Sequence, residues 1–325
     1  MQMLQKQAVA TRNRLDVAAK ELTTNLKASR FEASGGNLTR LFALERSLDR
    51  NAVFSQTISL TELRLEIMQE SFGKLLKPAE SLALDLTQST SLGDYSASML
   101  HAGTARSAFV DAVGLLNTQV AGQSLFAGTE TDSAALIDAE AILSALQAAV
   151  GGATTAAGAV AAVDAYFASP GGGFFATAYA GSTDGVTPVD IGEGQRLDYA
   201  MRADEQRIVA LLRAHATAAV VADGALAGNQ AERMAMLADA GARTLAAKEG
   251  VLDLRTAVGI MQERVENAKA SRVSERETLD LARAKIVAVD PLVAASAYQQ
   301  LEVQLESIYT VTARLAGLRF SNFMP

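Results

Sequence analysis

The chain has 325 residues, of which 49 % are hydrophobic and 20 % charged, so it can build one large domain or two modest ones with real cores. Its formal net charge is −7 with no basic patch to balance it, which argues against nucleic acid or an anionic membrane surface as the main partner. Cysteine is absent, which excludes disulfides, thiolate catalysis and cysteine-ligated metals.

The aromatic content and the lengths of the apolar stretches further limit the class of protein. Aromatic residues make up only 5 % and alanine is common, so packing must rely on small and aliphatic side chains, as it does in helical rods. The chain has no apolar stretch long enough for a signal-peptide core near its start or for a membrane span of about 20 residues. We therefore expect neither a cleaved signal peptide nor membrane insertion.

The first predicted element is an amphipathic helix over residues 4–26. Its apolar face carries three leucines, namely Leu15, Leu22 and Leu26. After a glycine-containing break at residues 34–37, a second helical stretch passes into a seam over residues 65–86, by which we mean apolar residues at alternating spacings of three and four. Pro78 lies inside this seam and predicts a kink or a local break near Leu75.

The middle of the chain differs in character. Helical spacing returns over residues 102–120, and residues 138–167 then predict two short alanine-rich helices. Three strand-like pieces follow, at residues 174–179, 186–191 and 195–201. A glycine-rich turn at residues 192–194 joins the last two pieces, and residues 204–215 predict a helix. We interpret this part as a small α+β insert domain with little core of its own.

The C-terminal third carries a second long seam, over residues 251–286. Asp290-Pro291 then opens another helix, because aspartate caps a helix and proline is tolerated in its first turn. Its seam contains Tyr298, Leu301, Leu305, Ile308 and Leu315. Such narrow stripes are stable only when facing helices remove them from water, so the N-terminal and C-terminal seams should pack against each other.

The predicted fold class is therefore mainly α: an elongated helical bundle formed by the N- and C-terminal segments, with a small α+β insert domain. The expected division places residues 1–130 in the N-terminal half of the bundle, 131–217 in the insert and 218–325 in the C-terminal half. His101 and His215 are the only histidines and stand far apart, with no nearby pattern typical of a catalytic or metal site. No nucleotide-binding glycine pattern opens a helix. We expect no catalytic residue, no cofactor and no enzyme.

One stretch carries more information, at residues 125–132 with the sequence LFAGTETD. By local chemistry alone it predicts a helix end, with Gly128 as the stop. The stretch also resembles the "LFAGT.TD" signature of the flagellar hook-associated protein 3 family, the hook–filament junction proteins related to flagellin. The positions that match are Leu125, Phe126, Ala127, Gly128, Thr129 and Asp132.

A second match lies at the other end of the chain. Residues 289–323, including the ending Arg319-Phe320-Ser321-Asn322-Phe323, look like the C-terminal helix of that family. Residues 184–202 are more weakly similar to its middle domain. Residues 27–41 depart from it, because they lack the "SGKRI..PSDDP" pattern common near the family's N-terminus.

The resemblance implies a flagellin-like, non-enzymatic building block that forms the layer between hook and filament. The implied partners are hook-associated protein 1, flagellin, further copies of the chain in a ring and a flagellar export chaperone. The implied location is the extracellular flagellum, reached through the flagellar type III channel. Subunits would pack through Leu15, Leu22, Leu26, Leu301, Leu305, Ile308 and Leu315. The alternatives are flagellin itself and, from another class, a cytoplasmic coiled-coil scaffold or signalling module.

Overall fold

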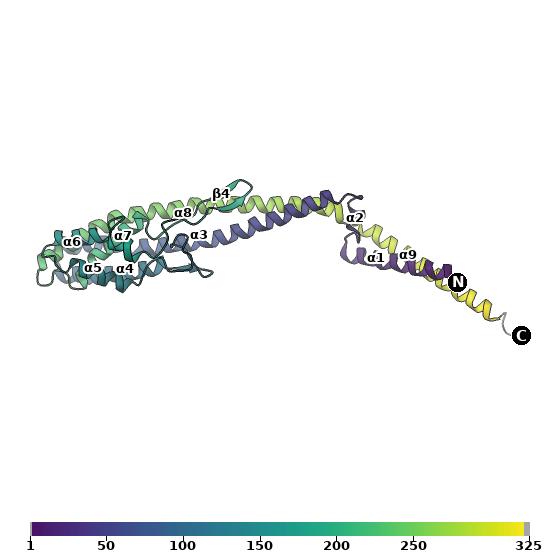
Figure 1. Ribbon diagram of the computed structural model, residues 1–325, viewed down its shortest axis with the longest axis horizontal. Coiled ribbons are helices and arrows are strands. Elements are labelled where there is room, and N and C mark those ends of the chain that lie inside the picture. Colours follow the sequence, from purple (N-terminus) through teal and green to yellow (C-terminus); the bar gives the residue numbers. More distant parts are fainter. Residues whose placement is uncertain (1, 322–325) are drawn as a thin grey trace. The chain divides into compact units, whose positions relative to one another are not determined.

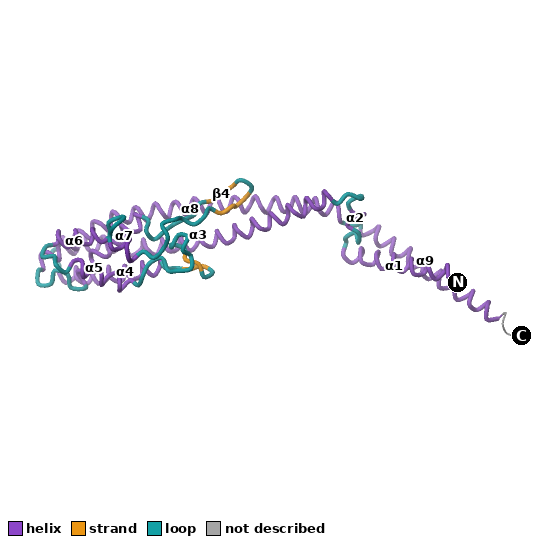
Figure 2. The backbone as a smooth tube through the Cα atoms, in the orientation of Figure 1, coloured by secondary structure: helices purple, strands orange, loops and turns teal. Residues whose placement is uncertain are grey.

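The computed structural model describes residues 2–321, which are mainly helical, as expected (Figure 1). The helices are α1 (Gln2–Thr24), α2 (Arg30–Ala33), α3 (Thr39–Ser91), α4 (Tyr95–Leu116), α5 (Ala139–Val150), α6 (Ala156–Tyr166), the π-helix η1 (Phe174–Ala178), α7 (Gln206–Ala222), α8 (Gln230–Val287) and α9 (Pro291–Ser321). The strands are β1 (Gln119–Val120), β2 (Gln123–Ser124), β3 (Val189–Gly192) and β4 (Gln195–Leu197), paired as two antiparallel two-stranded sheets (Figure 2).

Contacts group the chain into two compact units. Unit 1 holds the residues up to Val53 and those from Ser271 on, and unit 2 holds Phe54–Ala270. Helices α3 and α8 contribute to both units because each is longer than 50 residues. The division at residues 130 and 217 stays a prediction.

Unit 1 is built on the pairing of the first helix with the last, and α1 lies alongside α9 (Figure 1). Two backbone hydrogen bonds join the chain just after α1 to the turn between α8 and α9. Lys27 N donates to Val287 O at 2.8 Å, and Val289 N donates to Asn25 O at 3.1 Å. Asp290 Oδ1 accepts from Leu292 N at 2.8 Å, so the expected cap of α9 is present.

Unit 2 has one continuous hydrophobic core. Leu65 and Phe72 of α3, Phe109 of α4 and Val258 of α8 are fully buried in it, so the N- and C-terminal segments share one bundle, as the matched seams predict. The ion pair between Lys269 and Glu62, with nitrogen and oxygen 2.9 Å apart, spans the same two long helices.

The insert does not stand apart from this core. Ile142 of α5, Val163 of α6 and Leu211 of α7 belong to the same buried cluster as the bundle helices, and α7 packs along α4. The helices α5, α6 and α7 therefore complete the core of the bundle. An insert domain with little core of its own stays a prediction.

One local expectation is wrong in part and another is wrong. Helix α3 runs through Pro78 without the local break, because Leu75, Ala79 and Leu82 around it are buried and their packing offsets the one hydrogen bond that proline removes. The kink near Leu75 stays a prediction. The strand expected at residues 174–179 is instead the π-helix η1. Phe174 sits in an aromatic cluster with its ring centroid 5.2 Å from that of Phe167, and this packing overrides the strand propensity of the segment.

The expected hairpin near residue 190 is present in shorter form, as β3 and β4 joined around Gly194 with φ +68°. The predicted helix at residues 204–215 is also present, as the longer α7. This helix is buried over almost its whole circumference, and His215 is buried with it, at 1 % exposure. Within residues 2–321, neither ring nitrogen of His215 has a hydrogen-bond partner, so His215 is a neutral core side chain.

Burial lowers the pKa of His215 from 6.5 to about 4, because the apolar surroundings disfavour the imidazolium. Between those two values the unfolded chain binds the proton and the folded chain does not. Stability is therefore full above pH 6.5 and falls as the pH drops towards 4, by about 2–3 kcal/mol from this residue between pH 7.5 and 4.5. We expect His215→Leu to abolish that part of the acid loss, measured as the difference in urea unfolding free energy at the two pH values.

The matched control is the other histidine, partly exposed His101 on α4, 3.9 Å from Asp85. His101→Gln should leave most of the acid loss in place. A His215→Leu protein that loses as much stability in acid as the parent would contradict the assignment.

Candidate subunit-packing surfaces

The terminal helices carry seams of heptad spacing that face each other within one chain. On α1 the seam positions are Leu4, Ala8, Thr11, Leu15, Ala18 and Leu22, and all are buried or half-buried. On α9 they are Ala294, Tyr298, Leu301, Leu305, Ile308, Thr312 and Leu315, of which Leu315 alone is exposed. Spacings of three and four keep such residues on one side of a helix, so each helix covers the stripe of the other.

The structure therefore brings together most of the proposed packing residues, but as an intramolecular pair. Leu15 and Leu22 lie on the α1 seam, and Leu305 and Ile308 lie on the α9 seam, each half-buried rather than bare. Their remaining exposure leaves room for contact with a further helix at the edges of the pair. Their role between subunits stays a proposal.

Leu26 does not belong to this set. Helix α1 ends at Thr24, and Asn25 takes a positive φ of 54°, which turns the chain out of the helix. Leu26 then forms an isolated antiparallel bridge with Ala288 and is 45 % exposed. The residue spacing predicted Leu26 on the helical face, because no glycine or proline near Asn25 indicates that the helix ends there.

The outer faces of the two helices carry apolar side chains that nothing in the described part of the chain covers. On α1 these are Met3, Val9 and Val17, and on α9 Val303, Tyr309 and Val311. Val303 lies on the side of α9 opposite to Leu301 and Leu305 and is 65 % exposed.

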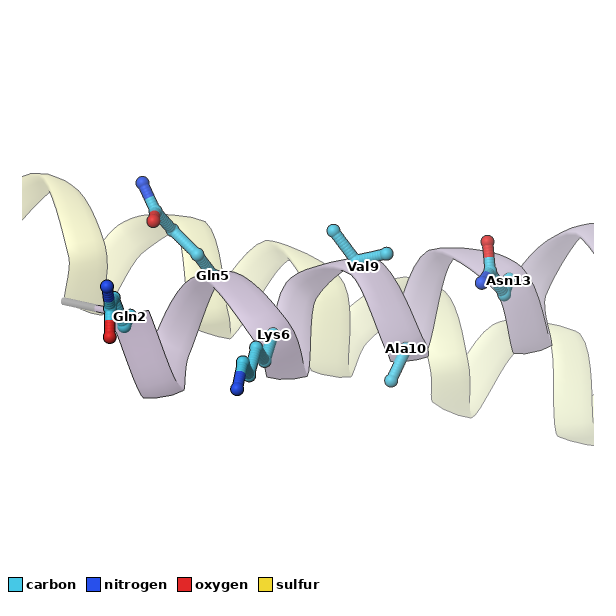
Figure 3. Close-up of a pocket in the computed structure, with 6 residues that line it drawn as sticks. All are labelled: Gln2, Gln5, Lys6, Val9, Ala10 and Asn13. Atoms are coloured by element: carbon cyan, nitrogen blue, oxygen red, sulfur yellow. The ribbon is translucent and has the colours of Figure 1, made fainter.

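Figure 3 shows part of the outer face of α1, with Val9 and Asn13 on α1 and the ribbon of α9 behind. A shallow hollow of about 540 Å³ runs along this face. Its lining residues are Gln2, Gln5, Lys6, Val9, Ala10 and Asn13. Because one helix supplies all six, no groups converge on a bound small molecule, whereas the long open shape suits a helix laid alongside.

A cluster of possible metal ligands is absent from the described residues. No group of three or more histidine, aspartate or glutamate side chains within residues 2–321 is placed to hold a metal ion. No helix in the same part of the chain is both long and apolar enough to span a membrane.

The stretch at residues 125–132 forms a half-buried loop, not a helix end. Helix α4 already stops at Leu116, and the small β1–β2 hairpin separates it from this loop, so the expected role of Gly128 as a helix stop is wrong. Leu125, Phe126, Ala127 and Gly128 are buried, whereas Thr129 and Asp132 are exposed. The apolar half of the stretch is therefore part of the core, which the local sequence pattern did not predict.

Two segments of the insert hold this loop through its backbone. Ser182 N donates to Ala127 O at 2.9 Å, and Ala203 N donates to Phe126 O at 2.9 Å. The Phe126 ring lies edge-on against Phe72 of α3, with centroids 5.9 Å apart. The loop thus connects the insert to the bundle.

A polar cluster closes the other side of the loop. Arg202 Nε donates to Asp204 Oδ1 at 2.7 Å, and the same guanidinium donates to the carbonyl of Thr183. Burial, followed by the nearby Asp204 charge, raises the pKa of Tyr179, whose hydroxyl donates to Ser182 O at 2.8 Å. The segment that contacts Ala127, residues 182–184, is therefore held by hydrogen bonds from both Arg202 and Tyr179.

Gly128 is the one position of the loop where only glycine fits. Its φ is +65°, and a Cβ there would lie 2.5 Å from Asp184 O and 2.7 Å from Ser182 O. Both atoms belong to the backbone that the loop packs against, so they cannot move aside as a flexible side chain could. The requirement comes from a segment more than 50 residues away, which no local pattern reveals.

Gly128→Ala should therefore destabilise the chain by more than the cost of a left-handed backbone alone. Gly122 supplies the matched control, since its φ is +78° but a Cβ there meets nothing within 4 Å. We expect Gly122→Ala to cost about 1–2 kcal/mol of unfolding free energy in urea. Gly128→Ala should cost clearly more, and equal losses for the two variants would contradict the close-contact argument.

Comparison with known proteins gives a fold but no sequence family. No protein-family model matches the sequence, and no curated protein sequence matches it. The structure resembles that of a putative flagellar hook-associated protein from Vibrio parahaemolyticus, with a TM-score of 0.51 and 16 % identity over 75 % of this chain and 95 % of that one. It also resembles the crystal structure of Bacillus cereus FlgL, with a TM-score of 0.52 and 14 % identity over 75 % of this chain and 100 % of that one.

At these identities the likeness establishes a shared fold. Of the C-terminal match, Asn322 and Phe323 lie outside the described residues. The rest of that segment is helical, as α9, through Ser321.

Proposed function

We propose that the chain is a structural subunit of the bacterial flagellum that forms the layer joining the hook to the filament. The observation that carries the proposal is the fold shared with two flagellar hook-associated proteins over three quarters of the chain. The sequence resemblance at residues 125–132 and along α9 points to the same class of protein.

The terminal unit suits assembly by helix packing. The α1–α9 pair covers its inner seam and leaves apolar side chains such as Val9 and Val303 on its outer faces. A soluble subunit gains by exposing such residues only if other helices cover them in the assembled state. The contacts between subunits would then fall on the outer faces, with Leu15, Leu22, Leu301, Leu305, Ile308 and Leu315 supporting them from within the pair.

The proposal also assigns partners and a location. Hook-associated protein 1 would lie on the hook side of the layer, flagellin on the filament side and further copies of the chain within it. An export chaperone would hold the unassembled chain, which would leave the cell unfolded through the flagellar type III channel. The absence of cysteine fits such a route, because no disulfide has to be broken for the chain to unfold.

A strain that lacks this chain should make hooks without filaments, seen by electron microscopy, and should release unassembled flagellin into the medium. Labelling the restored chain with antibody should place it in one band at the hook end of the filament. Label along the whole filament would instead identify the chain as a flagellin. Normal filaments in the deletion strain would contradict both assignments.

Val303→Glu should abolish assembly while leaving the monomer folded, because a carboxylate on an interface that excludes water costs several kcal/mol of association. The melting temperature of the purified chain should stay within about 2 °C, since Val303 is 65 % exposed. Val258→Glu should instead lower it by about 10 °C or more, because Val258 is fully buried within one chain.

Leu84 provides the control for added surface charge, since it is 67 % exposed on α3 in unit 2. Leu84→Glu should change neither melting temperature nor motility. The packing role of the outer face would be wrong if Val303→Glu cells swam as well as Leu84→Glu cells.

A further inference from the structure

Unit 2 exposes an apolar stripe on α8 that the core does not use. Leu245, Leu252 and Ile260 are 50 %, 43 % and 57 % exposed. Their spacings of seven and eight residues place them on one side of the helix, within about a quarter of its circumference. From Leu245 to Ile260 the stripe runs for about 22 Å along the helix.

The charged side chains on the arc itself are acidic. Glu249, Asp253 and Glu263 share the arc with the three apolar residues and are exposed. Lys248 lies just outside the arc, with its ammonium 3.8 Å from Glu249 Oε1. We call this surface, residues 242–263 on that side of α8, the acidic stripe. A surface that combines apolar and acidic side chains is best covered by one that combines an apolar floor with cations.

A groove of about 550 Å³ on the same unit has that composition. It lies between the segment after α6, helix α7 and helix α8. Its apolar wall includes Phe167, Phe175, Val209 and Ala210, and α8 contributes only small residues to it. Among the residues lining the groove, those with a charge are Arg207 and Arg213. We call this surface the arginine groove.

The two arginines are held at the groove without being buried. Arg207 Nε lies 2.9 Å from Glu205 Oε1, and Arg213 pairs more loosely with Asp164 at 3.5 Å. The Arg207 side chain crosses α8 at Gly250, where a Cβ would lie 3.0 Å from Arg207 Cγ. Each guanidinium has five N–H donors, so with one partner carboxylate it can still donate to a second carboxylate.

Helix α8 contributes to both surfaces, at positions about a third of a turn apart. Its residues Ala246, Ala247 and Gly250 face the groove. Leu245 and Leu252 belong to the stripe. We propose that the acidic stripe of one copy docks in the arginine groove of the next. Leu245 and Leu252 contact the apolar wall, and Glu249 and Asp253 meet Arg207 and Arg213.

Because the two surfaces differ, this contact is head-to-tail, and repeating it builds a ring or a helical layer rather than a closed pair. The inference rests on the proposed function, which requires copies side by side. It goes further by naming the lateral contact and by placing it in unit 2, whereas the outer faces of α1 and α9 belong to unit 1.

The absence of cysteine allows a direct test by cross-linking, since every introduced thiol is the only one in its chain. Full-length Ala210→Cys, in the groove, is mixed with full-length Leu252→Cys, in the stripe, and oxidised. This is done with concentrated purified chain and with flagella from cells that express both variants. We expect a disulfide-linked dimer of one chain of each kind, read by mass spectrometry.

The control mixes Ala210→Cys with Leu84→Cys, another exposed leucine on unit 2, and should give at least tenfold less mixed dimer. A charge swap provides the second measurement. Arg207→Glu with Arg213→Glu in the groove chain should lower the yield several-fold, and Glu249→Arg with Asp253→Arg in the stripe chain should restore it.

A yield for Leu252→Cys no higher than for Leu84→Cys in both preparations would overturn the contact. So would a charge swap that fails to restore the yield. If deletion of the gene nevertheless gives hooks without filaments, the junction role stands and only this lateral contact is wrong.

Discussion

The arrangement depends on one constraint, that narrow apolar stripes on long helices must be removed from water by other helices. In unit 2 the stripes of α3 and α8 belong to one buried cluster with side chains of α4 and α7, so Phe72 and Val258 reach full burial. In unit 1 only two helices, α1 and α9, meet along most of their length. A pair of helices can bury one side of each and no more, which is why Leu305 remains half-buried while Val258 does not.

Sequence periodicity predicted the parts of the fold that this constraint governs. The helices, their seams and the cap at Asp290 follow from local chemistry, and the structure has them with shifts of a few residues. Prediction failed where packing overrides local preference. The break expected near Pro78 is absent because the side chains around it are buried, and Phe174 becomes helical because Phe167 supplies an aromatic contact.

The candidate packing residues show the same limit. Heptad spacing placed Leu15, Leu22, Leu301, Leu305 and Ile308 on stripes but could not say whether another chain or the same chain covers them. Because α1 pairs with α9, the same chain covers the inner seam. The side chains that remain exposed for contact with another chain include Val9 and Val303. The stretch at residues 125–132 could be noticed only through resemblance. The need for glycine at 128 comes from the carbonyls of Ser182 and Asp184, which sequence alone does not bring near.

The hydrogen bonds from Lys27 to Val287 and from Val289 to Asn25 have a consequence for the order of folding. They join the chain some 25 residues from its start to a point near residue 288, so α1 acquires its partner only when almost the whole polypeptide is present. Contacts this distant in sequence form late, because a very long loop must close before they contribute. During synthesis, and during any passage through a narrow channel with one end leading, the stripe on α1 has no partner from its own chain. Helix α1 can therefore pair with α9 only after both helices have emerged.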